Sequence, residues 1–399
     1  MKKILYFIPE FPKLTETFIE REVSKLVDLG VLDVRVLSVK KASGFLSPNL
    51  TERVTFRDIS ILDFFRGIKY LISSFGRLHD ILVIIFSVNS PKLAVSNMIY
   101  FLKSVGYAYV IDSFKPDHIH SHFLSYPSTI VMFVSILLAK PFSISGHARD
   151  VFVDGELIPQ KVARAKFISI CNTYAWSKCI ELSKGENASN VHKIYHGMNL
   201  TSLLAKEPKM VKPSRPLIFA GSRLVEKKGL KYLIEASKTL KERGVNHEVH
   251  IVGPGPLYQQ LVDMVNFLGL SDTVFIPGAG KGVSNADIME YFKIADIFAH
   301  PSIETGTGDV DGVPTFVIES SMAKVPVVTT RAGSITDLID DETGVLVKQK
   351  DPYSLADGLE KLIVSPELRK SLGQKAYDRA KVMFDLDVNV TSLQTLFLE

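Results

Sequence analysis

The sequence repeats one pattern twice: short apolar runs typical of strands alternate with stretches typical of helices. The strand-like runs of the first half are 3–8, 33–39, 117–122, 141–146, 166–171 and 191–197, and those of the second half are 217–221, 248–253, 273–278, 296–301, 325–330 and 344–347. Strands that alternate with helices form parallel sheets, because each helix returns the chain to the start of the next strand. The pattern therefore predicts an α/β fold of two Rossmann-like, parallel-sheet domains that face each other across a cleft.

A polar segment separates the two halves. Residues 198–216, MNLTSLLAKEPKMVKPSRP, contain three prolines, several lysines and little periodicity, which is typical of a linker. We expect one domain at 1–197, with a helical insert at about 59–111, and a second at 217–383. A helix at about 384–399 could pack back on the first domain. A chain of 399 residues is long enough for two such cores.

The overall charge limits the class of ligand. The net charge is +4 and the pI is near 8.7, which is too weakly basic to indicate nucleic-acid binding. An anionic ligand or an anionic membrane surface is compatible with it. The two cysteines, Cys171 and Cys179, have no metal-ligand or redox spacing, and this favours a reducing compartment. The apolar run after Lys2 and Lys3 stops at Pro9, too soon for a signal peptide, so we expect a cytoplasmic protein.

Two segments are apolar enough to raise the question of membrane contact. Residues 123–139 contain no charge, but they are short for a bilayer span and include Pro127, so they predict a buried core helix. Residues 59–111 are apolar and carry five separated cations, Arg66, Lys69, Arg77, Lys92 and Lys103. That pattern predicts amphipathic helices that either pack on the domain or lie on a membrane surface, with packing favoured.

Ligands of parallel sheets bind beyond the carboxyl ends of the strands, so the loops there are the candidates for function. After the strand at 217–221, Arg223 and Lys228 precede Gly229, which opens an amphipathic helix. Two cations beside a helix N-terminus favour a phosphate site, since side-chain charge, free N–H groups and the helix dipole act together. The alternative is a pair of solvated basic residues.

The segment GDVDGVPTFVIES (308–320) offers two carboxylate pairs. Asp309 and Asp311 form an acid-x-acid pair suited to a divalent metal, whereas Asp311 and Glu319 bracket the turn into a helix and suit a polyol. Pro314 fits the first turn of that helix, whose free N–H groups would form a second anion site. Glu319, in the first or second turn, could accept two ribose hydroxyls or could merely balance the helix dipole.

Histidines follow two strands of the first half. His147 lies directly after a strand in SGHARD, near Arg149 and Asp150, and is a functional candidate at the edge of the cleft. His118, His120 and His122 alternate and so face one side of their strand. We do not expect a metal there, because the sequence shows no acidic or cysteine ligand to complete the set.

A helix is predicted at 16–29, ending at Gly30. Thr15 is its candidate cap. The segment around Thr15 could be functional or an ordinary helix start.

Several stretches together resemble one family, the retaining, nucleotide-sugar-dependent glycosyltransferases of family 4, which have the glycosyltransferase-B fold. The stretches are FPKLTETFI, HIHSHF, FSISGHARDVF, GSRLVEKKGLKYLIEA, GPGPLYQQL, HPS, DVDGVPTFVIESSMAKVPVVTT and TGVLV, in the order of the family's motifs. The likeness runs nearly end to end. It is closest to bacterial members that assemble exopolysaccharide, capsule or O-antigen chains.

The resemblance implies a role for each matching residue. Arg223 and Lys228 match the cations that bind the pyrophosphate, Asp311 and Glu319 match the acid pair that meets the donor sugar and the ribose, and His147 matches a histidine at the donor sugar. The implied catalytic set is His147, Arg223, Lys228 and Asp311. The implied donor-binding set is Thr15, Gly221, Arg223, Lys228, Gly278, Asp311, Gly312, Val313, Pro314, Thr315 and Glu319.

Asp311 departs from the glutamate that is commoner in the family. Asn199 likewise replaces the usual aspartate, in what we interpret as a structural position.

The expected reaction transfers a sugar from a nucleoside-diphosphate sugar, UDP rather than GDP, to a hydroxyl of a glycan or lipid-linked acceptor, with retention. No side chain is an obvious nucleophile, so catalysis would rest on stabilising the leaving group. The first domain would serve the acceptor and the second the nucleotide sugar. We expect no cofactor and no metal, no nucleic-acid partner, and at most peripheral contact with the cytoplasmic membrane face. The alternatives are a nucleotide-sugar epimerase and a non-catalytic glycan-binding protein.

Overall fold

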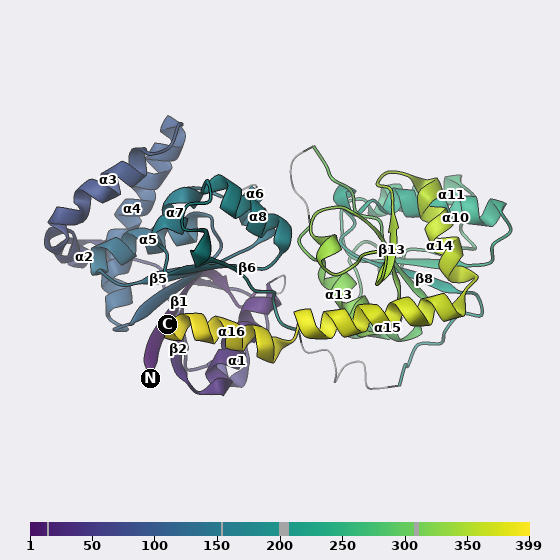
Figure 1. Cartoon of the computed structure of the whole chain (residues 1–399), viewed down its shortest axis with the longest axis horizontal. Coiled ribbons are helices and arrows are strands. Elements are labelled where there is room, and N and C mark those ends of the chain that lie inside the picture. Colours follow the sequence, from purple (N-terminus) through teal and green to yellow (C-terminus); the bar gives the residue numbers. More distant parts are fainter. Residues whose placement is uncertain (14–15, 153–154, 199–206, 307–310) are drawn as a thin grey trace. The chain divides into compact units, whose positions relative to one another are not determined.

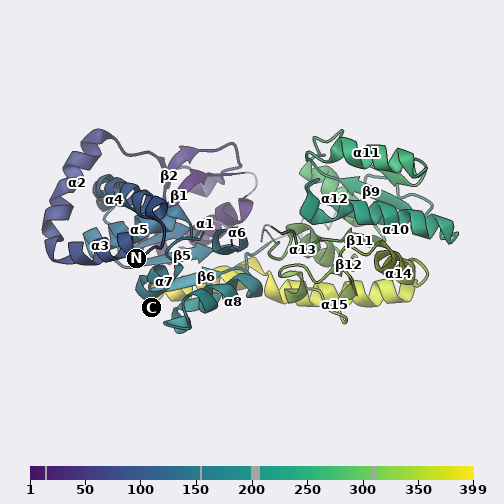
Figure 2. The ribbon, with the colours of Figure 1, turned by 90° about the horizontal axis from the view of Figure 1, so that it is seen from above.

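A computed structural model describes residues 1–13, 16–152, 155–198, 207–306 and 311–399 (Figure 1). The chain divides into two compact units: Met1–Met198 together with Leu386–Glu399, and Asn199–Asp385. The second unit thus includes almost all of the segment 198–216, and the last helix belongs to the first unit. Each unit contains one parallel sheet with helices on its faces (Figures 1 and 2), and the predicted α/β class with two parallel-sheet domains is confirmed.

The described strands of the first unit form a seven-stranded parallel sheet of order β3-β2-β1-β4-β5-β6-β7. The strands are β1 (Lys2–Phe11), β2 (Leu32–Lys41), β3 (Val54–Phe56), β4 (His118–His122), β5 (Phe142–Gly146), β6 (Phe167–Ile170) and β7 (Val191–Lys193). The helices are α1 (Thr17–Leu29), α2 (Ile61–Ser73), α3 (Leu78–Phe86), α4 (Pro91–Asp112), α5 (Tyr126–Leu138), α6 (Ala148–Phe152), α7 (Ile158–Arg164), α8 (Thr173–Leu182) and α16 (Leu386–Leu398), with short 3-10 turns η1 (Pro48–Leu50), η2 (Phe75–Arg77) and η3 (Ala188–Asn190).

The described strands of the second unit form a six-stranded parallel sheet of order β10-β9-β8-β11-β12-β13. The strands are β8 (Leu217–Gly221), β9 (Glu248–Val252), β10 (Val274–Phe275), β11 (Ile297–His300), β12 (Val327–Thr330) and β13 (Gly344–Val347). The helices are α10 (Leu230–Glu242), α11 (Tyr258–Phe267), α12 (Asn285–Ile294), α13 (Thr315–Met322), α14 (Pro352–Ile363) and α15 (Pro366–Met383), with 3-10 turns η4 (Glu226–Lys228) and η5 (Ile335–Asp337).

The strand order reverses once in each sheet. In the first sheet the reversal separates β1 from β4, and in the second it separates β8 from β11, where Ile218 pairs with Ile297 and Phe219 with Phe298. Chains leave such a pair of strands in opposite directions, so a crevice opens beyond their carboxyl ends. The loops after β1 and β4, and after β8 and β11, are therefore the positions where each unit can hold a ligand.

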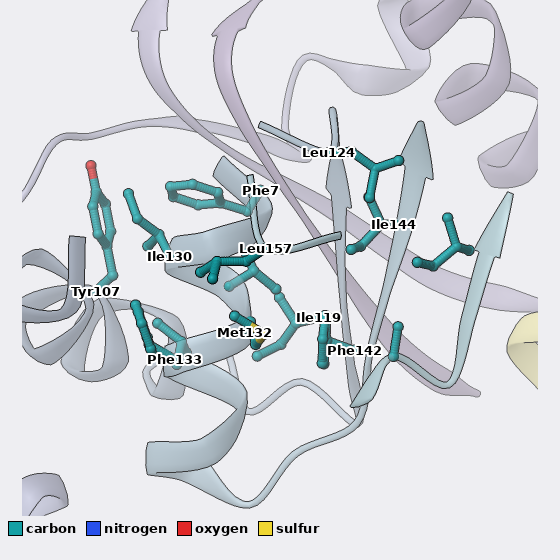
Figure 3. Packing of buried hydrophobic residues seen from close by; sticks show 14 of the residues in the cluster. Phe7, Tyr107, Ile119, Leu124, Ile130, Met132, Phe133, Phe142, Ile144 and Leu157 are labelled. Carbon is teal, nitrogen blue, oxygen red and sulfur yellow. The ribbon is translucent and has the colours of Figure 1, made fainter. Parts of the chain in front are cut away.

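The uncharged segment at 123–139 forms part of the core of the first unit. α5 lies within residues 123–139 and buries most of its length, which confirms the predicted core helix. Figure 3 shows Phe133 of α5 and Tyr107 of α4 among the residues packed with Ile119 and Phe142 of the sheet. Among the helices that the structure describes, none combines the length and apolar character needed to cross a bilayer.

The insert at 59–111 consists of α2, η2, α3 and α4. Its inner side chains, among them Ile81, Ile84, Ile85 and Val105, join the core of the first unit, which confirms that the insert packs.

The start of α1 differs from the prediction. α1 begins at Thr17 and Glu16 occupies the cap position, without a side-chain cap hydrogen bond, because the chain turns one residue later than the Thr15 pattern indicated. Thr15 itself lies outside the described residues. The predicted end at Gly30 is confirmed by its left-handed backbone, with φ of 66°.

Candidate active site

The loop after β8 carries the two predicted phosphate-binding cations. β8 ends at Gly221, Arg223 follows as an exposed residue, and Lys228 is the buried last residue of η4. A Cβ atom on Gly221 would lie 2.4 Å from Cε1 of Phe316. Gly221 therefore lets the first turn of α13 pack directly against the end of β8.

Lys228 forms a largely buried ion pair with Asp311, and the two side chains are 10% and 13% exposed. Nζ of Lys228 donates a hydrogen bond to Oδ2 of Asp311 at 2.7 Å, and Nζ of Lys227 lies 3.3 Å from Oδ1. The hydroxyl of Ser302 donates to Oδ2 at 3.2 Å, and Nε2 of His300 lies 3.7 Å from the same oxygen. Four side chains, from the loop after β8, the last residue of β11 and the loop after β11, thus surround one carboxylate.

These contacts fix the protonation states of the site. Burial by itself raises the pKa of the Asp311 carboxyl, but the charge of Lys228, with His300 and Lys227, lowers that pKa well below its ordinary value. Burial lowers the pKa of Lys228, and the charge of Asp311 opposes that shift. Burial, and then the charge of Lys228, lowers the pKa of His300 to about 4. Near pH 7 the site therefore holds an ionised Asp311 beside a neutral His300.

The loops after β8 and β11 are joined through their backbones. Gly229 has φ of 62°, and a Cβ atom there would lie 2.0 Å from the carbonyl oxygen of Pro301. The N–H of Ile303 donates to the carbonyl of Lys227 at 2.8 Å. Only glycine allows this approach without displacing the Pro301 backbone, so Gly229 sets the distance between the two loops.

The remaining predicted donor residues of this segment surround the start of α13. Pro314 occupies the N-cap position, one residue before its predicted place in the first turn, and α13 begins at Thr315. Gly312 and Val313 are half-buried. Glu319 is also half-buried and lies in the second turn of the helix.

Asp309 belongs to residues 307–310, which lie outside the described residues, so the structure does not describe the Asp309–Asp311 pair.

Gly278 lies in a different turn, after β10. Its φ is 88°, and its carbonyl accepts a hydrogen bond from the N–H of Lys281 at 2.8 Å. Lys281 also bridges to Pro254, so this turn contacts the loop after β9. The described contacts bring Lys228, Asp311, Gly221 and the start of α13 together, and they attach Gly278 to the neighbouring loop.

A second group of polar side chains surrounds His147 in the first unit. The ring of His147 stacks against those of His122 and His196, with centroids 5.6 and 5.0 Å apart. The rings of Phe18 and Phe123 lie 5.0 and 4.9 Å from it. These residues come from α1 and from the carboxyl ends of β4, β5 and β7, so the fold gathers them beyond one edge of the sheet.

Asp150 anchors His147. One oxygen of Asp150 accepts a hydrogen bond from the backbone N–H of His147 at 2.8 Å, and the other accepts one from the backbone N–H of Leu124. Both ring nitrogens of His147 and Nε2 of His196 are buried and make no hydrogen bond within the described residues. Buried imidazole nitrogens require partners, and a substrate hydroxyl or a water molecule could supply them.

A buried carboxylate lies behind this group. Oε1 of Glu22 accepts a hydrogen bond from the hydroxyl of Tyr6 at 3.0 Å and lies 3.3 Å from Nε2 of His122. A cavity of about 10 Å³, lined in part by Glu22, Ser145 and His196, adjoins it. That volume and polar lining match a single water molecule.

The position of Glu22 corrects the reason given for excluding a metal at the β4 histidines. Ligand atoms of Glu22, His120 and His122 all lie within 4.8 Å of one another, so an acidic ligand does complete the set. However, the two ring nitrogens of His120 hydrogen-bond to the hydroxyls of Ser143 and Ser145, at 2.7 and 3.1 Å. In this arrangement His120 takes part in a hydrogen-bond network and offers no nitrogen to a metal.

Some site residues were not predicted, although signals for them exist. Glu22 falls on the buried stripe of α1 with Ile19, Val23 and Leu26, and a charge on such a stripe indicates a specific partner. Lys227 adjoins Lys228, and His300 lies near the carboxyl end of the strand predicted at 296–301. His196 lies three residues after β7, whereas His147 directly follows β5.

Parts of the chain are similar in sequence to known proteins. Residues 205–379 match the family described as glycosyl transferases group 1. WcaL of Escherichia coli (strain K12), named for colanic acid biosynthesis, is 36% identical over 155 residues, covering 38% of this chain and 37% of WcaL. A GDP-mannose-dependent alpha-(1-6)-phosphatidylinositol monomannoside mannosyltransferase of Mycolicibacterium smegmatis is 31% identical over 161 residues, 40% of this chain and 41% of the relative. These matches span about two fifths of the relatives' length.

One similarity extends further. The amylovoran biosynthesis glycosyltransferase AmsK of Erwinia amylovora is 23% identical over 379 residues, 89% of each chain.

Solved structures agree on the fold. A glycosyltransferase from Rickettsia africae superposes with a TM-score of 0.72 at 17% identity, covering 99% of this chain and 98% of the other. Anabaena HepE, in complex with UDP and glucose, superposes with a TM-score of 0.68 at 16% identity over all of both chains. The chain therefore has the glycosyltransferase-B fold, and its residues 205–379 match the glycosyl transferases group 1 family.

Proposed function

We propose that this chain is a retaining glycosyltransferase that moves a sugar from a nucleoside-diphosphate sugar to a hydroxyl of a growing glycan or lipid-linked acceptor in cell-surface polysaccharide synthesis. The observation that supports it most is the group formed by Lys228, Lys227 and Asp311 at the β8–β11 reversal. It combines cations for a diphosphate with an ionised acceptor for sugar hydroxyls, at the position where a parallel sheet binds ligands.

The cations would act on the leaving group. As the bond between the anomeric carbon and the phosphate oxygen breaks, negative charge grows on the departing diphosphate. Lys228 and Arg223 lie after β8 and the start of α13 lies after β11, so these cations and helix N–H groups would stabilise that charge. The acceptor hydroxyl then bonds to the same face of the anomeric carbon, and its proton passes to the departing phosphate oxygen.

Asp311 would bind the donor sugar and would not attack it. Its oxygens already accept hydrogen bonds from Lys228 and Ser302 and lie close to Lys227, which stabilises the negative charge and lowers its nucleophilicity. The same ionised oxygens can accept hydrogen bonds from sugar hydroxyls. This supports transfer without a covalent intermediate on the enzyme, in line with retention by positioning and leaving-group stabilisation.

The nucleotide base differs among similar proteins. HepE was solved with UDP and glucose, whereas the mycobacterial relative is named for GDP-mannose, so similar proteins cover both bases. We propose a UDP-sugar, and an acceptor that meets the imidazoles of His147 and His196 in the first unit. Their buried, unbonded nitrogens would then pair with sugar or acceptor hydroxyls.

Two measurements test the proposal. Thermal shift with a panel of UDP-, GDP- and ADP-sugars should show stabilisation by one donor, because binding to the folded state stabilises it by mass action. Product analysis with that donor and a glycan acceptor should show a new glycosidic bond with the donor's anomeric configuration. An altered sugar nucleotide formed without acceptor would indicate an epimerase instead. Donor binding with neither hydrolysis nor transfer would indicate a non-catalytic protein.

A further inference from the structure

The helical insert of the first unit leaves many large apolar side chains in water. Figures 1 and 2 show α2, α3 and α4 together at one end of this unit. Phe65 of α2, Phe75 of η2 and Phe86 of α3 are 60%, 77% and 65% exposed. The other exposed apolar residues of the insert are Ile61, Leu62, Ile72, Leu82, Val83, Val95, Ile99 and Leu102. An exposed apolar patch of this extent marks an interaction surface.

On α2 the apolar residues form a stripe with a basic edge. Successive residues of a helix are about 100° apart, so Ile61, Phe65 and Ile72 fall within about 40° of one another. Arg66 and Lys69 follow on one side of that stripe. The opposite face of α2 is packed, since a Cβ atom on Gly67 would lie 1.9 Å from the carbonyl oxygen of Val105.

α4 repeats this arrangement. Val95, Ile99 and Leu102 share one exposed face, with Lys92 and Lys103 at its side. Tyr109 lies seven residues after Leu102 and continues the same face.

Cation–π contacts join the two helices at this face. The Arg66 guanidinium and Nζ of Lys69 lie 5.5 and 5.7 Å from the centroid of the Tyr109 ring. The basic edge of α2 therefore contacts the half-buried Tyr109 near the C-terminal end of α4.

α3 is apolar on both sides. Ile81, Ile84 and Ile85 are buried in the core of the unit, while Leu82, Val83 and Phe86 face outward. A helix that is apolar all round is normally covered on every side. The outward half of α3 is therefore incompletely covered in the isolated chain.

The charge of the insert selects the covering partner. Residues 59–111 contain five cations and two acids, Asp63 and Asp80, which leaves a formal charge of +3. Asp63 is buried, and its carboxylate accepts a hydrogen bond from Arg57 at 2.6 Å. The exposed surface of the insert is thus mainly apolar and aromatic, and Asp80 is its one exposed acid beside the exposed cations Arg66, Lys69, Lys92 and Lys103. That composition is typical of helices that lie in a membrane interface with anionic headgroups.

We propose that the outer faces of α2, η2, α3 and α4 dock on a bilayer surface that contains anionic lipid. The apolar side chains enter the boundary between headgroups and acyl chains, and the flanking cations meet lipid phosphates. This surface is separate from the proposed donor site in the second unit, and the inference does not depend on the proposed transfer activity. It would hold the enzyme where lipid-linked acceptors are found.

The test uses the full chain and sedimentation with vesicles. Binding is expected to vesicles of phosphatidylcholine mixed with phosphatidylglycerol, to weaken as salt rises, and to be weak on phosphatidylcholine alone. A variant carrying Phe65→Ser, Phe75→Ser and Phe86→Ser should lose at least tenfold in affinity. A variant carrying Arg66→Gln, Lys69→Gln and Lys92→Gln should lose about a hundredfold on the anionic vesicles.

A matched control comes from the second unit. Phe267, Val364 and Val382 are 88%, 68% and 73% exposed, so Phe267→Ser, Val364→Ser and Val382→Ser remove exposed apolar groups elsewhere and should leave vesicle binding unchanged. Circular dichroism establishes that each variant is folded. The inference is overturned if the phenylalanine variant binds as the parent chain does. It is also overturned if light scattering shows a lipid-free oligomer that this variant disrupts, because a second copy would then cover the patch. Donor binding measured on the same variants reports on the proposed function separately.

Discussion

Nζ of Lys228 and Oδ2 of Asp311 lie 2.7 Å apart, although 83 positions separate the two residues in the sequence. The family resemblance assigns them to different parts of the donor, the diphosphate and the sugar. Their contact means that the phosphate-binding and sugar-binding groups form one electrostatic unit. A donor would have to share or replace this ion pair when it binds.

The ion pair predicts a thermodynamic coupling. Lys228→Ala or Asp311→Ala alone leaves a largely buried charge without its main partner and should cost about 3 kcal/mol of unfolding free energy. The double variant should cost less than the sum, because neither charge is then left behind. Urea unfolding of the four proteins measures this. Additive effects would contradict the coupling.

The same lysine should be needed for turnover. Lys228→Ala should lower the transfer rate at least tenfold, since a charge-assisted contact to the leaving group typically contributes about 1.5–3 kcal/mol. Lys231→Ala is the matched control. Lys231 lies in α10, three residues after Lys228, and is exposed, so this substitution should leave the transfer rate nearly unchanged. Unchanged kinetics of Lys228→Ala would refute the assignment.

The segment 308–320 contains two carboxylate pairs, and substitutions can show which pair acts in sugar transfer. Glu319→Ala and Asp311→Ala should cripple transfer, and Asp309→Ala should have a mild effect, because Asp311 and Glu319 are assigned to the donor. Arg223 and Lys228 supply positive charge to the diphosphate, so a chelator should leave activity largely intact. Loss of activity with chelator and its recovery with manganese or magnesium would favour the Asp309–Asp311 metal pair instead.

Alanine substitutions of Gly229 and Gly244 should destabilise the protein to different extents, because the space around the two residues differs. Gly229 and Gly244 have similar left-handed backbones, with φ of 62° and 73°. A Cβ atom on Gly229 would lie 2.0 Å from the oxygen of Pro301, whereas nothing lies within 4 Å of one on Gly244. Gly244→Ala should therefore cost only backbone strain, about 1–2 kcal/mol. Gly229→Ala should cost more and should also weaken donor binding. Equal melting temperatures would show that the loops after β8 and β11 can separate freely.

Glu22 should act through His122 and His147. Glu22→Gln keeps the side-chain shape but removes the charge next to His122, so we expect turnover to fall severalfold while donor affinity in the second unit is kept. The control is Glu20→Gln on the same helix, since Glu20 is equally buried, at 8% exposure, and accepts instead from the N–H of Ser47. A shifted pH dependence of turnover in Glu22→Gln alone would distinguish positioning of the imidazoles from a loss of stability. Equal effects of both substitutions would contradict this role.

The buried histidines predict loss of stability in mild acid. Burial lowers the pKa of His300 to about 4 and that of His118 to about 3, whereas an unfolded histidine titrates near 6.5. As the pH falls from about 6.5 toward 4, the unfolded chain therefore binds protons that the folded chain does not, and stability decreases. Between pH 7 and 5 each such histidine should account for roughly 1–2 kcal/mol. His300→Gln should reduce this pH slope in urea titrations. A slope that His300→Gln leaves unchanged would refute the argument.

The sequence by itself determined the two sheets and most of their strands. Apolar runs of strand length, separated by helical periodicity, are local signals, and β8 and β13 begin and end at the predicted residues. β3 was missed because three half-buried or exposed residues, Val54–Phe56, carry no such signal. The loop position of Lys228 and the start of α13 also followed from local pattern, to within about one residue.

Only the tertiary structure decided which side chains meet. Helical periodicity shows that Glu22 lies on a buried face, but its partners Tyr6 and His122 come from β1 and β4, whose pairing depends on sheet order. Lys228 reaches Asp311 because β8 and β11 are neighbours and Gly229 lets their loops touch. Periodicity fixes the direction of a side chain relative to its own element. The distance between two elements is fixed by how the whole sheet and its loops pack, and this is why the contacts of both sites could not be predicted from local sequence.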